Sequence, residues 1–325
     1  MSRQDAAATP MDGRRIAGLL RDLLPYAGLV AVVVFFAVSS EFFFNMRNFE
    51  RLVTDSATLM LVAFGMTLVI LLGEIDLSVG AVVSLLAVIL AQMMDGGTSW
   101  PLAVLAILLL GLAIGLVNGV ITAVGDIPSF IVTLGMMAIA TGLSFVFTGA
   151  ISVAILNEPF LVLFYDARVL GLPMPLVVVL VAFATCLLFL NRTVPGRELF
   201  AVGANPAAAK LSGVPVLRRK VTVFAIMGVL VALAAVLSAA RLGSGAPASV
   251  PALTLDAIAA VIIGGASLFG GRASLVRTLM GAALIAVLNN GMVLMNVNID
   301  LQYVVKGVII LLAVVLERLA SGARP

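Results

Sequence analysis

The sequence predicts an all-α membrane protein, a polytopic bundle of about ten helices, from its composition and its apolar runs. Hydrophobic residues make up 62% of the 325 residues, whereas charged residues make up 11%. Apolar runs of about 20 residues, enough to cross a hydrocarbon core about 30 Å thick, recur along the chain. Backbone groups in lipid must find partners within the protein, and the polar–apolar alternation of a barrel is absent, so helices are expected.

The apolar runs predict one transmembrane domain, residues 23–319, between terminal tails at 1–22 and 320–325. The eighth of its ten expected spans is short and glycine-rich, AIAAVIIGGASLFGG, so a broken or re-entrant helix is an alternative there. The ten spans are 24–44, 52–72, 77–95, 101–123, 127–148, 174–190, 221–240, 255–270, 276–296 and 301–317.

Charge placement predicts that both termini are cytoplasmic. With six spans before residue 191, fourteen of the nineteen Lys and Arg residues fall on the same side as the termini, which is the bias of the positive-inside rule. The basic N-terminal tail lacks a convincing small-residue cleavage site, so we expect it to be retained. The remaining five basic residues lie on the other side or within spans: Arg47, Arg51, Arg168, Arg241 and Lys306.

The inventory of side chains excludes several classes of site. The chain has no histidine, and its one cysteine, Cys186, falls in the middle of a span. Metal sites built on His or Cys, disulfides, and catalysis by Cys–His or Ser–His pairs are therefore excluded. No lysine stands in the Gly-Lys-Ser/Thr context of a phosphate loop. We expect a protein that is not an enzyme, with no catalytic residue, metal, bound cofactor or nucleic-acid partner.

The one long polar interruption between spans is the loop 191–220, NRTVPGRELFAVGANPAAAKLSGVPVLRRK. It holds six of the nineteen basic residues, opposed only by Glu198. Within it a short helix is predicted, with Asn205 at the N-cap, Pro206 at the first helical position and Gly213 as a left-handed stop. A cationic loop of this kind indicates contact with a partner on the cytoplasmic side.

A helix of about two turns is not stable alone in water, so this one must be held by packing. Its small apolar face, Ala207, Ala208 and Leu211, suits a cleft in another protein. The alternative is a helix that lies flat against its own bundle or against the lipid surface.

Polar residues at the start of the third span have two interpretations. Asp76 and Ser78 suit N-capping, because an acidic group and a hydroxyl satisfy free N–H groups and match the helix dipole. Alternatively, Glu74 and Asp76 form a polar neck at an inner gate. Acid–base catalysis by the two carboxylates is rejected, since no water-activating partner accompanies them.

Other polar residues fall within the spans themselves. Lys306 and Asp55 serve either as structural anchors near the outer ends or as parts of a polar pathway, because intramembrane charges are costly and often functional. Asn289 and Asn290 can hydrogen-bond across helices or face a polyol. The glycine clusters 243–245, 264–265 and 270–271 allow close helix approach or line a path where a helix is broken. A weak internal repeat in the sequence aligns Gly73, Leu77 and Gly80 with Gly264, Leu268 and Gly271.

Six segments, in order, resemble the membrane permease of bacterial ATP-binding-cassette sugar importers of the ribose type, which includes importers of xylose, arabinose and galactose. Each segment alone is weak because glycine and aliphatic residues dominate it, but six in order make a strong signal over residues 45–319. They are 73–80 (GEIDLSVG), 126–137 (DIPSFIVTLGMM), 196–213 (GRELFAVGANPAAAKLSG), 255–272 (LDAIAAVIIGGASLFGGR), 288–291 (LNNG) and 304–307 (VVKG).

The resemblance implies a multi-pass permease of the bacterial inner membrane that carries a sugar or sugar alcohol. It implies three protein partners: a second permease copy or a related permease, an extracytoplasmic sugar-binding protein, and a cytoplasmic ATPase that uses ATP and Mg²⁺. The segment 196–213 resembles the coupling segment that docks into the ATPase. Its implied coupling residues are Gly196, Arg197, Gly203, Asn205, Pro206, Lys210, Leu211, Ser212 and Gly213.

Two departures leave the substrate open among pentoses, hexoses and sugar alcohols. Glu74 stands where the family commonly has glycine, and residues 149–160 (GAISVAILNEPF) differ from the usual Gly-Gly-Gln-Pro-Ile type. The candidates for a translocation path or gate are Glu74, Asp76, Ser78, Asn289, Asn290 and Lys306. The alternative function is an ion-coupled secondary transporter without an ATPase, which would need ionisable groups at mid-membrane. An intramembrane enzyme would lack a nucleophile–base or metal set.

Overall fold

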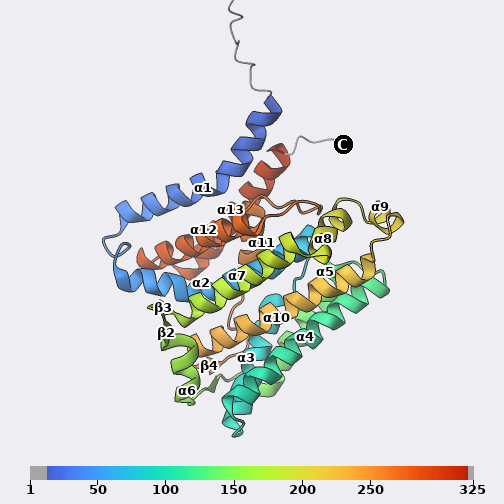
Figure 1. Cartoon of the computed structure of the whole chain (residues 1–325). Coiled ribbons are helices and arrows are strands. Elements are labelled where there is room, and N and C mark those ends of the chain that lie inside the picture. The colour runs from blue at the N-terminus through green and yellow to red at the C-terminus, as the bar shows by residue number, and fades with distance from the viewer. Residues whose placement is uncertain (1–12, 321–325) are drawn as a thin grey trace, which may run out of the picture.

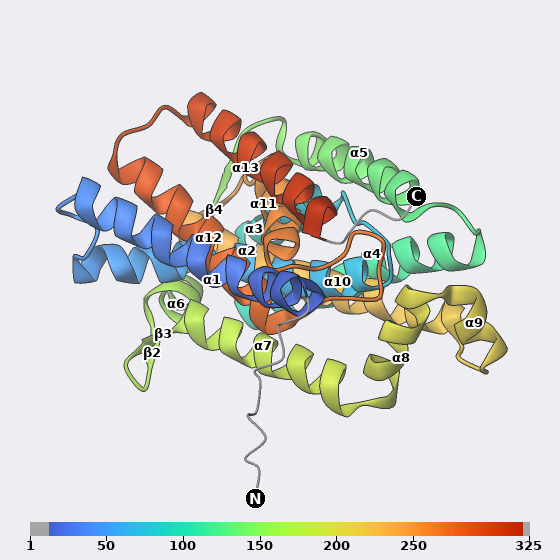
Figure 2. The same ribbon diagram turned by 90° about the horizontal axis from the view of Figure 1, so that it is seen from above.

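The computed structural model describes residues 13–320, and the predicted helical bundle is confirmed (Figures 1 and 2). Residues 1–12 and 321–325 of the predicted tails lie outside the described residues. One helix corresponds to each predicted span: α1 (Gly13–Ser39), α2 (Met46–Leu71), α3 (Val79–Asp95), α4 (Trp100–Val124), α5 (Ser129–Thr148), α7 (Met174–Arg192), α10 (Val216–Leu242), α11 (Leu253–Ile263), α12 (Leu275–Leu294) and α13 (Ile299–Ala320).

Short elements mark the two ends of the bundle. Helices α8 (Val194–Ala204) and α9 (Pro206–Leu211) lie at one end, on the right of Figure 1, which we call the α9 end. The opposite end, on the left, holds α6 (Glu158–Leu161), the π-helix η1 (Val162–Asp166) and the hairpin of β2 (Arg168–Val169) and β3 (Leu172–Pro173). We call it the hairpin end.

Both strand pairs are antiparallel and only two residues long. The turn between β2 and β3 is Leu170–Gly171, and both residues have positive φ, +53° and +80°, as a two-residue hairpin turn of type I′ requires. β1 (Val153–Ala154) pairs with β4 (Ser244–Gly245), with Val153 opposite Gly245. This second pair joins the segment after α5 to the end of α10.

Not every helix is long enough to cross a membrane. Among the described residues, six helices are both long and apolar enough: α2, α4, α5, α7, α10 and α12. The apolar part of α1 (Tyr26–Ser39), α3 and α11 are shorter. The 11 residues of α11 rise only about 17 Å, so the prediction of a span over 255–270 is replaced by its stated alternative, a broken helix.

The first helix also differs from its predicted bounds. α1 begins at Gly13 and ends at Ser39, whereas the apolar run predicts 24–44. Hydropathy marks where the side chains become apolar, and charged residues such as Arg14 and Arg21 do not stop a helix. The predicted tail therefore overlaps the start of α1.

The centre of the bundle consists of α2 and α10. In each of these two helices, 78% of the most apolar 18-residue stretch is buried, compared with 28% in α4 and α7 and 17% in α5. Phe64 of α2 and Phe224 of α10 are fully buried. The figures agree, since α2 and α10 run through the middle with α4, α5, α7, α12 and α1 around them (Figures 1 and 2).

A row of glycines brings α4 against α10. Gly111, Gly115 and Gly119 are spaced by four residues and so lie on one face of α4. A Cβ atom at Gly115 would lie 3.1 Å from the Cα of Gly228, and one at Gly119 would lie 2.9 Å from the Cα of Val221. The two backbones are thus in direct contact, as in the small-residue packing of membrane helices.

Two non-helical segments interrupt the bundle near the α9 end. Segment 72–78 separates α2 from α3, and Gly73 has φ +75°. Segment 264–274 separates α11 from α12, and Gly265, Gly270 and Gly271 have φ of +79°, +85° and +76°. The two segments lie together, since a Cβ at Gly73 would be 3.3 Å from the carbonyl oxygen of Phe269.

The α4–α10 contact predicts a position-specific effect of leucine. We expect Gly115→Leu to lower the thermal stability of the detergent-purified protein, because overpacking a close contact costs about 1–3 kcal/mol. The matched control is Gly135→Leu on α5, where an added Cβ meets nothing within 4 Å. Equal melting temperatures for the two variants in a thermal unfolding assay would contradict the proposed contact.

Candidate functional site

The basic segment 191–220 contains two short helices where the sequence analysis predicts one. The predicted helix α9 is confirmed: Asn205 is its N-cap and accepts a hydrogen bond from the backbone N–H of Ala208 at 3.0 Å, and Gly213 follows with φ +83°. The additional helix α8 begins in the same way, because the hydroxyl of Thr193 accepts from the N–H of Gly196 at 3.1 Å.

Helix α9 presents its apolar face to the outside. Leu211 is 91% exposed, and Ala207, Ala208 and Lys210 are exposed, whereas Ala209 is buried. Of the residues predicted for coupling, Arg197, Asn205, Pro206, Ser212 and Gly213 are exposed as well. The face predicted to fit a partner is therefore not covered by any of residues 13–320.

A groove of about 540 Å³ lies beside this helix. It is lined from α9, from the segment that leads into α10 and from the turn between α4 and α5, which contributes Asp126. Basic side chains border it: Lys210, Arg218 and Lys220. The groove and the exposed face of α9 thus lie side by side at the α9 end.

Two predicted coupling residues, Gly196 and Gly203, are buried against the bundle. A Cβ at Gly196 would lie 2.7 Å from the Cα of Leu190, so this glycine lets α8 fold back on the end of α7. Gly203 is also buried, and a Cβ there would lie 2.6 Å from the backbone nitrogen of Gly271 and would clash with the carbonyl oxygen of Leu71. These glycines attach the segment to the bundle.

The contact at Gly203 joins three segments through their main chains. The N–H of Gly271 donates to the carbonyl oxygen of Leu71 at 2.9 Å. A Cβ at Gly270 would lie 2.8 Å from the carbonyl oxygen of Gly203 and 2.9 Å from the nitrogen of Gly73. We call this contact between α8, the end of α2 and segment 264–274 the glycine junction. It connects the exposed helices directly to both helix breaks.

Ion pairs hold the same region from α10. Glu74, in segment 72–78, pairs with Lys220 at 2.5 Å, and both side chains are largely buried, 12% and 21% exposed. Arg219 pairs with Glu198 of α8. Glu74, which stands where the family commonly has glycine, therefore has a cationic partner at the start of α10.

Asp76 and Ser78 interact with each other and not with a free helix end. One carboxylate oxygen of Asp76 accepts from the N–H of Ser78 at 2.8 Å and from its hydroxyl at 2.6 Å, and both residues are buried. Ser78 does occupy the N-cap position of α3, but its side chain makes no capping bond. The predicted N-cap is thus correct in position, but the carboxylate of Asp76 and not the hydroxyl of Ser78 accepts a backbone N–H there.

Hydroxyl groups of α5 satisfy the backbone of segment 72–78. The N–H of Ile75 donates to the hydroxyl of Ser129, and that of Leu77 donates to the hydroxyl of Thr133, both at 3.0 Å. Buried N–H groups outside a helix need such partners inside a membrane protein. α5 therefore holds the helix break in place.

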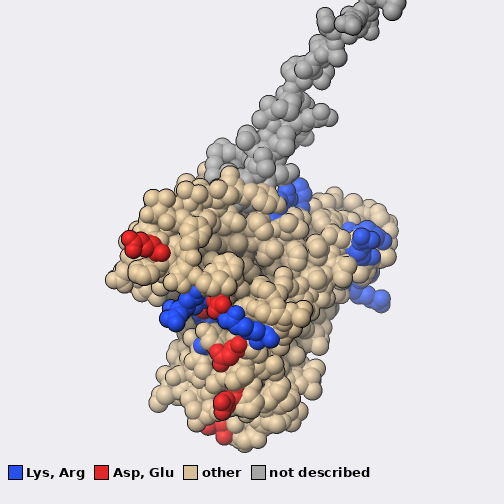
Figure 3. Space-filling model, turned by 60° about the vertical axis from the view of Figure 1, so that its left-hand side comes forward, with Lys and Arg blue, Asp and Glu red and all other residues tan. Residues whose placement is uncertain are grey.

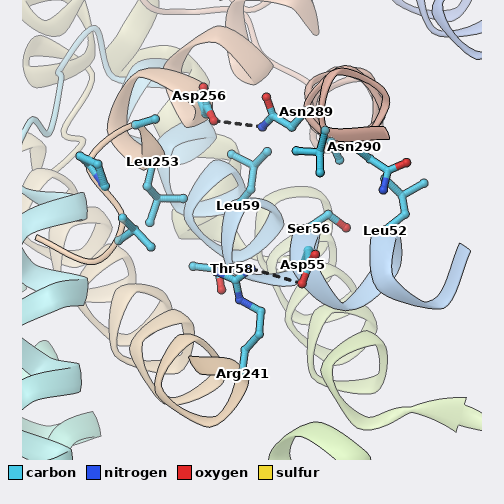
Figure 4. A pocket seen from close by; sticks show the side chains of 15 residues that line it. Leu52, Asp55, Ser56, Thr58, Leu59, Arg241, Leu253, Asp256, Asn289 and Asn290 are labelled. Atoms are coloured by element: carbon cyan, nitrogen blue, oxygen red, sulfur yellow. Dashed lines mark hydrogen bonds and ion pairs between the residues drawn. The ribbon is translucent and has the colours of Figure 1, made fainter. Parts of the chain in front are cut away.

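A polar cavity of about 300 Å³ lies among α2, α10, α11 and α12, toward the hairpin end (Figure 4). Asp55 of α2 forms an ion pair with Arg241 of α10 at 3.2 Å. Asp256 of α11 forms one with Lys306 of α13 at 3.0 Å and also accepts from the amide of Asn289 at 3.3 Å.

The ends of α2 and α12 are also joined by a polar contact beside this cavity. Asn48 and Asn290 exchange hydrogen bonds through their side-chain amides, at 2.8 and 3.0 Å. The expectation that Asn290 bonds across helices is confirmed, and so is that for Asn289. In the view of Figure 3, acidic and basic side chains form a mixed group near the middle of a largely uncharged surface, and further acidic side chains lie apart from it.

Two polar atoms at the cavity have no protein partner among the described residues. They are the Oδ1 of Asn289 and the Nε of Arg241, and both atoms are buried. Leaving a buried donor or acceptor unpaired costs about 1–3 kcal/mol. Both atoms belong to residues that line the cavity, but neither atom itself has surface that is open to it.

The six predicted path residues divide between the two regions. Glu74, Asp76 and Ser78 lie near the glycine junction, whereas Asn289 and Asn290 line the cavity and Lys306 is bonded to a carboxylate of its wall. The ion pair with Asp256 anchors Lys306 to α11. Sequence reasoning missed Asp256 as a site residue, although a carboxylate within an apolar run was a visible signal.

Comparison with known proteins identifies the class of this chain. Residues 48–314 match the family model described as the permease component of the branched-chain amino acid transport system. The chain belongs to this permease family. No solved structure matches it.

Curated relatives of this permease confirm the resemblance found from the six segments. The ribose import permease protein of Bacillus subtilis (strain 168) is 38% identical, over 94% of this chain and 95% of its own. The L-arabinose ABC transporter permease protein of Azospirillum brasilense is 36% identical, over 98% and 94%. The D-allose transport system permease protein of Escherichia coli (strain K12) is 35% identical, over 90% of each. These relatives are transport permeases and not enzymes.

The ion pair of Lys306 predicts a large effect on stability. We expect Lys306→Met to lower the thermal stability of the permease by about 3–5 kcal/mol, because it leaves the buried carboxylate of Asp256 without its cation. The matched control, Arg168→Met, breaks the more exposed pair with Glu50, whose side chains are 49% and 32% exposed, and should cost about 0–1 kcal/mol. Equal losses for the two variants in thermal unfolding would contradict this assignment.

Proposed function

We propose that this permease imports a sugar or sugar alcohol as the membrane subunit of an ATP-binding-cassette importer. The observation that carries the proposal is the set of curated relatives named for ribose, L-arabinose and D-allose, at 35–38% identity over at least 90% of this chain. An extracytoplasmic binding protein delivers the sugar, and separate ATPase subunits supply the free energy.

The chemistry of the cavity favours a neutral sugar over the amino acids in the family description. An amino acid carries both an ammonium and a carboxylate, and each needs a partner of opposite charge when it leaves water. In the cavity wall, Asp55 and Asp256 are already paired with Arg241 and Lys306. A polyol needs only donors and acceptors, so it leaves both ion pairs intact.

The ATPase docks at α9 in this proposal. Leu211 is exposed at the tip of the segment, and the groove beside it is bordered by basic side chains. Gly203 joins the segment to both helix breaks by main-chain contact, so a movement at α9 reaches the bundle. ATP and Mg²⁺ bind to the partner ATPase, and this chain has no catalytic role.

The assembly proposed is a pair of permeases, either two copies or this chain with a related one, in the bacterial inner membrane. The α9 end and both termini face the cytoplasm, in line with the fourteen of nineteen basic residues that the predicted topology assigns to that side. An ion-coupled transporter without an ATPase has less support, because the L-arabinose relative is named as an ABC transporter permease, and such transporters use an ATPase.

Transport by reconstituted vesicles tests the function. The permease, co-purified with the ATPase and placed in proteoliposomes with its binding protein, should take up at least one of D-ribose, L-arabinose and D-allose only when ATP is hydrolysed. Leu211→Asp should abolish both co-purification and uptake, because it puts a charge into an apolar contact. Leu170→Asp, at the 98% exposed hairpin tip, is the control and should change neither. Uptake driven by an ion gradient without the ATPase would refute the proposal.

Thiol labelling tests the orientation. In a Cys186→Ala background, which has no other cysteine, we expect Leu211→Cys to react with a membrane-impermeant maleimide only in inside-out vesicles. Leu170→Cys, at the opposite end of the bundle, should react only in right-side-out vesicles. The reverse pattern would place α9 outside the cell and remove the docking role.

A further inference from the structure

The basic groove beside α9 contains two cations that the protein itself does not neutralise. Its volume is about 540 Å³, and Lys210, Arg218 and Lys220 line it. Lys220 is already paired with Glu74. Within residues 13–320, Lys210 and Arg218 form no ion pair, and both are exposed. The groove therefore presents two accessible positive charges.

The start of α10 adds further positive potential to the same groove. No side chain caps the first turn of this helix, and its residues Val216, Leu217 and Arg218 line the groove. The free N–H groups and the dipole of a helix N-terminus attract an anion. Asp126 is the one carboxylate among the lining residues, so the two cations and the helix end outweigh it. The groove can thus hold one negatively charged group.

The other residues that line the groove are apolar. Leu217, which is 54% exposed, lies there with Val214 and Val216. Ala123 from the last turn of α4 completes this wall. The groove therefore lies where two membrane-spanning helices end, at the depth where lipid headgroups meet the hydrocarbon core. A phospholipid matches both the charge and the apolar walls, whereas a free anion matches the charge alone.

A second, apolar groove follows on the same two helices toward the hairpin end. Its volume is about 770 Å³, and its walls come from α4, α7 and α10, which neighbour one another in Figure 1. Arg218 lies one turn before Thr222 of this groove, on the same face of α10. Ala123 likewise lies two turns after Leu116, on the same face of α4. From Arg218 to Val229 of this groove, α10 rises about 17 Å, which is close to half of a hydrocarbon core about 30 Å thick.

We propose that the two grooves together bind one anionic phospholipid. Its phosphate lies between Lys210, Arg218 and the start of α10, and an acyl chain lies in the apolar groove. The proposed orientation of the permease places this lipid in the inner leaflet, but the binding itself depends neither on that orientation nor on an ATPase. Leu211 lines neither groove, so the lipid and a protein docked on Leu211 can be bound at the same time.

Native mass spectrometry of the full-length, detergent-purified permease, titrated with lipid, tests this site. We expect palmitoyl-oleoyl phosphatidylglycerol to bind at least about tenfold more tightly than phosphatidylcholine with the same chains, because only the former has a net negative charge. Lys210→Gln combined with Arg218→Gln should weaken phosphatidylglycerol binding roughly 25-fold, about fivefold for each cation. The matched control, Arg192→Gln with Arg197→Gln, removes two exposed cations near the same end that line neither groove, and it should bind almost as the unaltered chain does.

Three results would overturn the site. One is equal binding of the two lipids by the unaltered chain, and another is an equal loss in the groove variant and the control, which would show attraction to the basic end as a whole. The third is a groove variant that keeps its phosphatidylglycerol but no longer co-purifies with the ATPase, because its cations would then serve protein docking.

The length of the acyl chains tests the apolar groove in the unaltered chain, so this measurement does not depend on how any variant folds. Dihexanoyl phosphatidylglycerol should bind at least about tenfold more weakly than the long-chain lipid, since each buried methylene group adds to the affinity. Equal affinity of the two lipids, or displacement of the long-chain lipid by excess inorganic phosphate, would show that the basic groove holds a free anion and not a lipid.

Discussion

The need to satisfy backbone polar groups away from water governs the architecture of this permease. Continuous helices meet that need internally, but the chain breaks helix at 72–78 and at 264–274, where each N–H and C=O must find another partner. Hydroxyl groups of α5 and a main-chain bond from Gly271 to Leu71 supply partners there. The breaks are therefore held by their neighbours, and the placement of α5 follows from the same need.

Two chemically different regions follow from this arrangement. Near the α9 end, glycine brings main chains together and the paired charges Glu74 and Lys220 fasten segment 72–78 to α10. Toward the hairpin end, carboxylates that are paired with cations and an amide surround a cavity of about 300 Å³. In the first region main chains are in direct contact, and in the second polar side chains surround an open cavity. Helices α2 and α10 run through the buried centre and connect the two.

Patterns that act over a few residues were predictable from the sequence, and contacts between distant segments were not. The apolar runs located one helix for each of the ten expected spans, and Asn205, Pro206 and Gly213 located α9, because capping is local. The pair of Asp256 with Lys306 joins residues 50 positions apart, and the fit of α4 on α10 depends on which glycines face each other. Hydropathy alone could not distinguish α11 from a full span, since the glycines that follow it, at 264–265 and 270–271, were equally consistent with close packing.

The glycine junction has a mechanical consequence. Side chains can take up a small displacement by changing rotamer, so a contact made through long side chains dissipates part of any motion imposed on it. At Gly203, Gly270 and Gly271 main chain rests on main chain, and no flexible group stands between the elements. A shift of α8 by a fraction of an ångström must therefore appear with little loss in α2 and in the segment before α12.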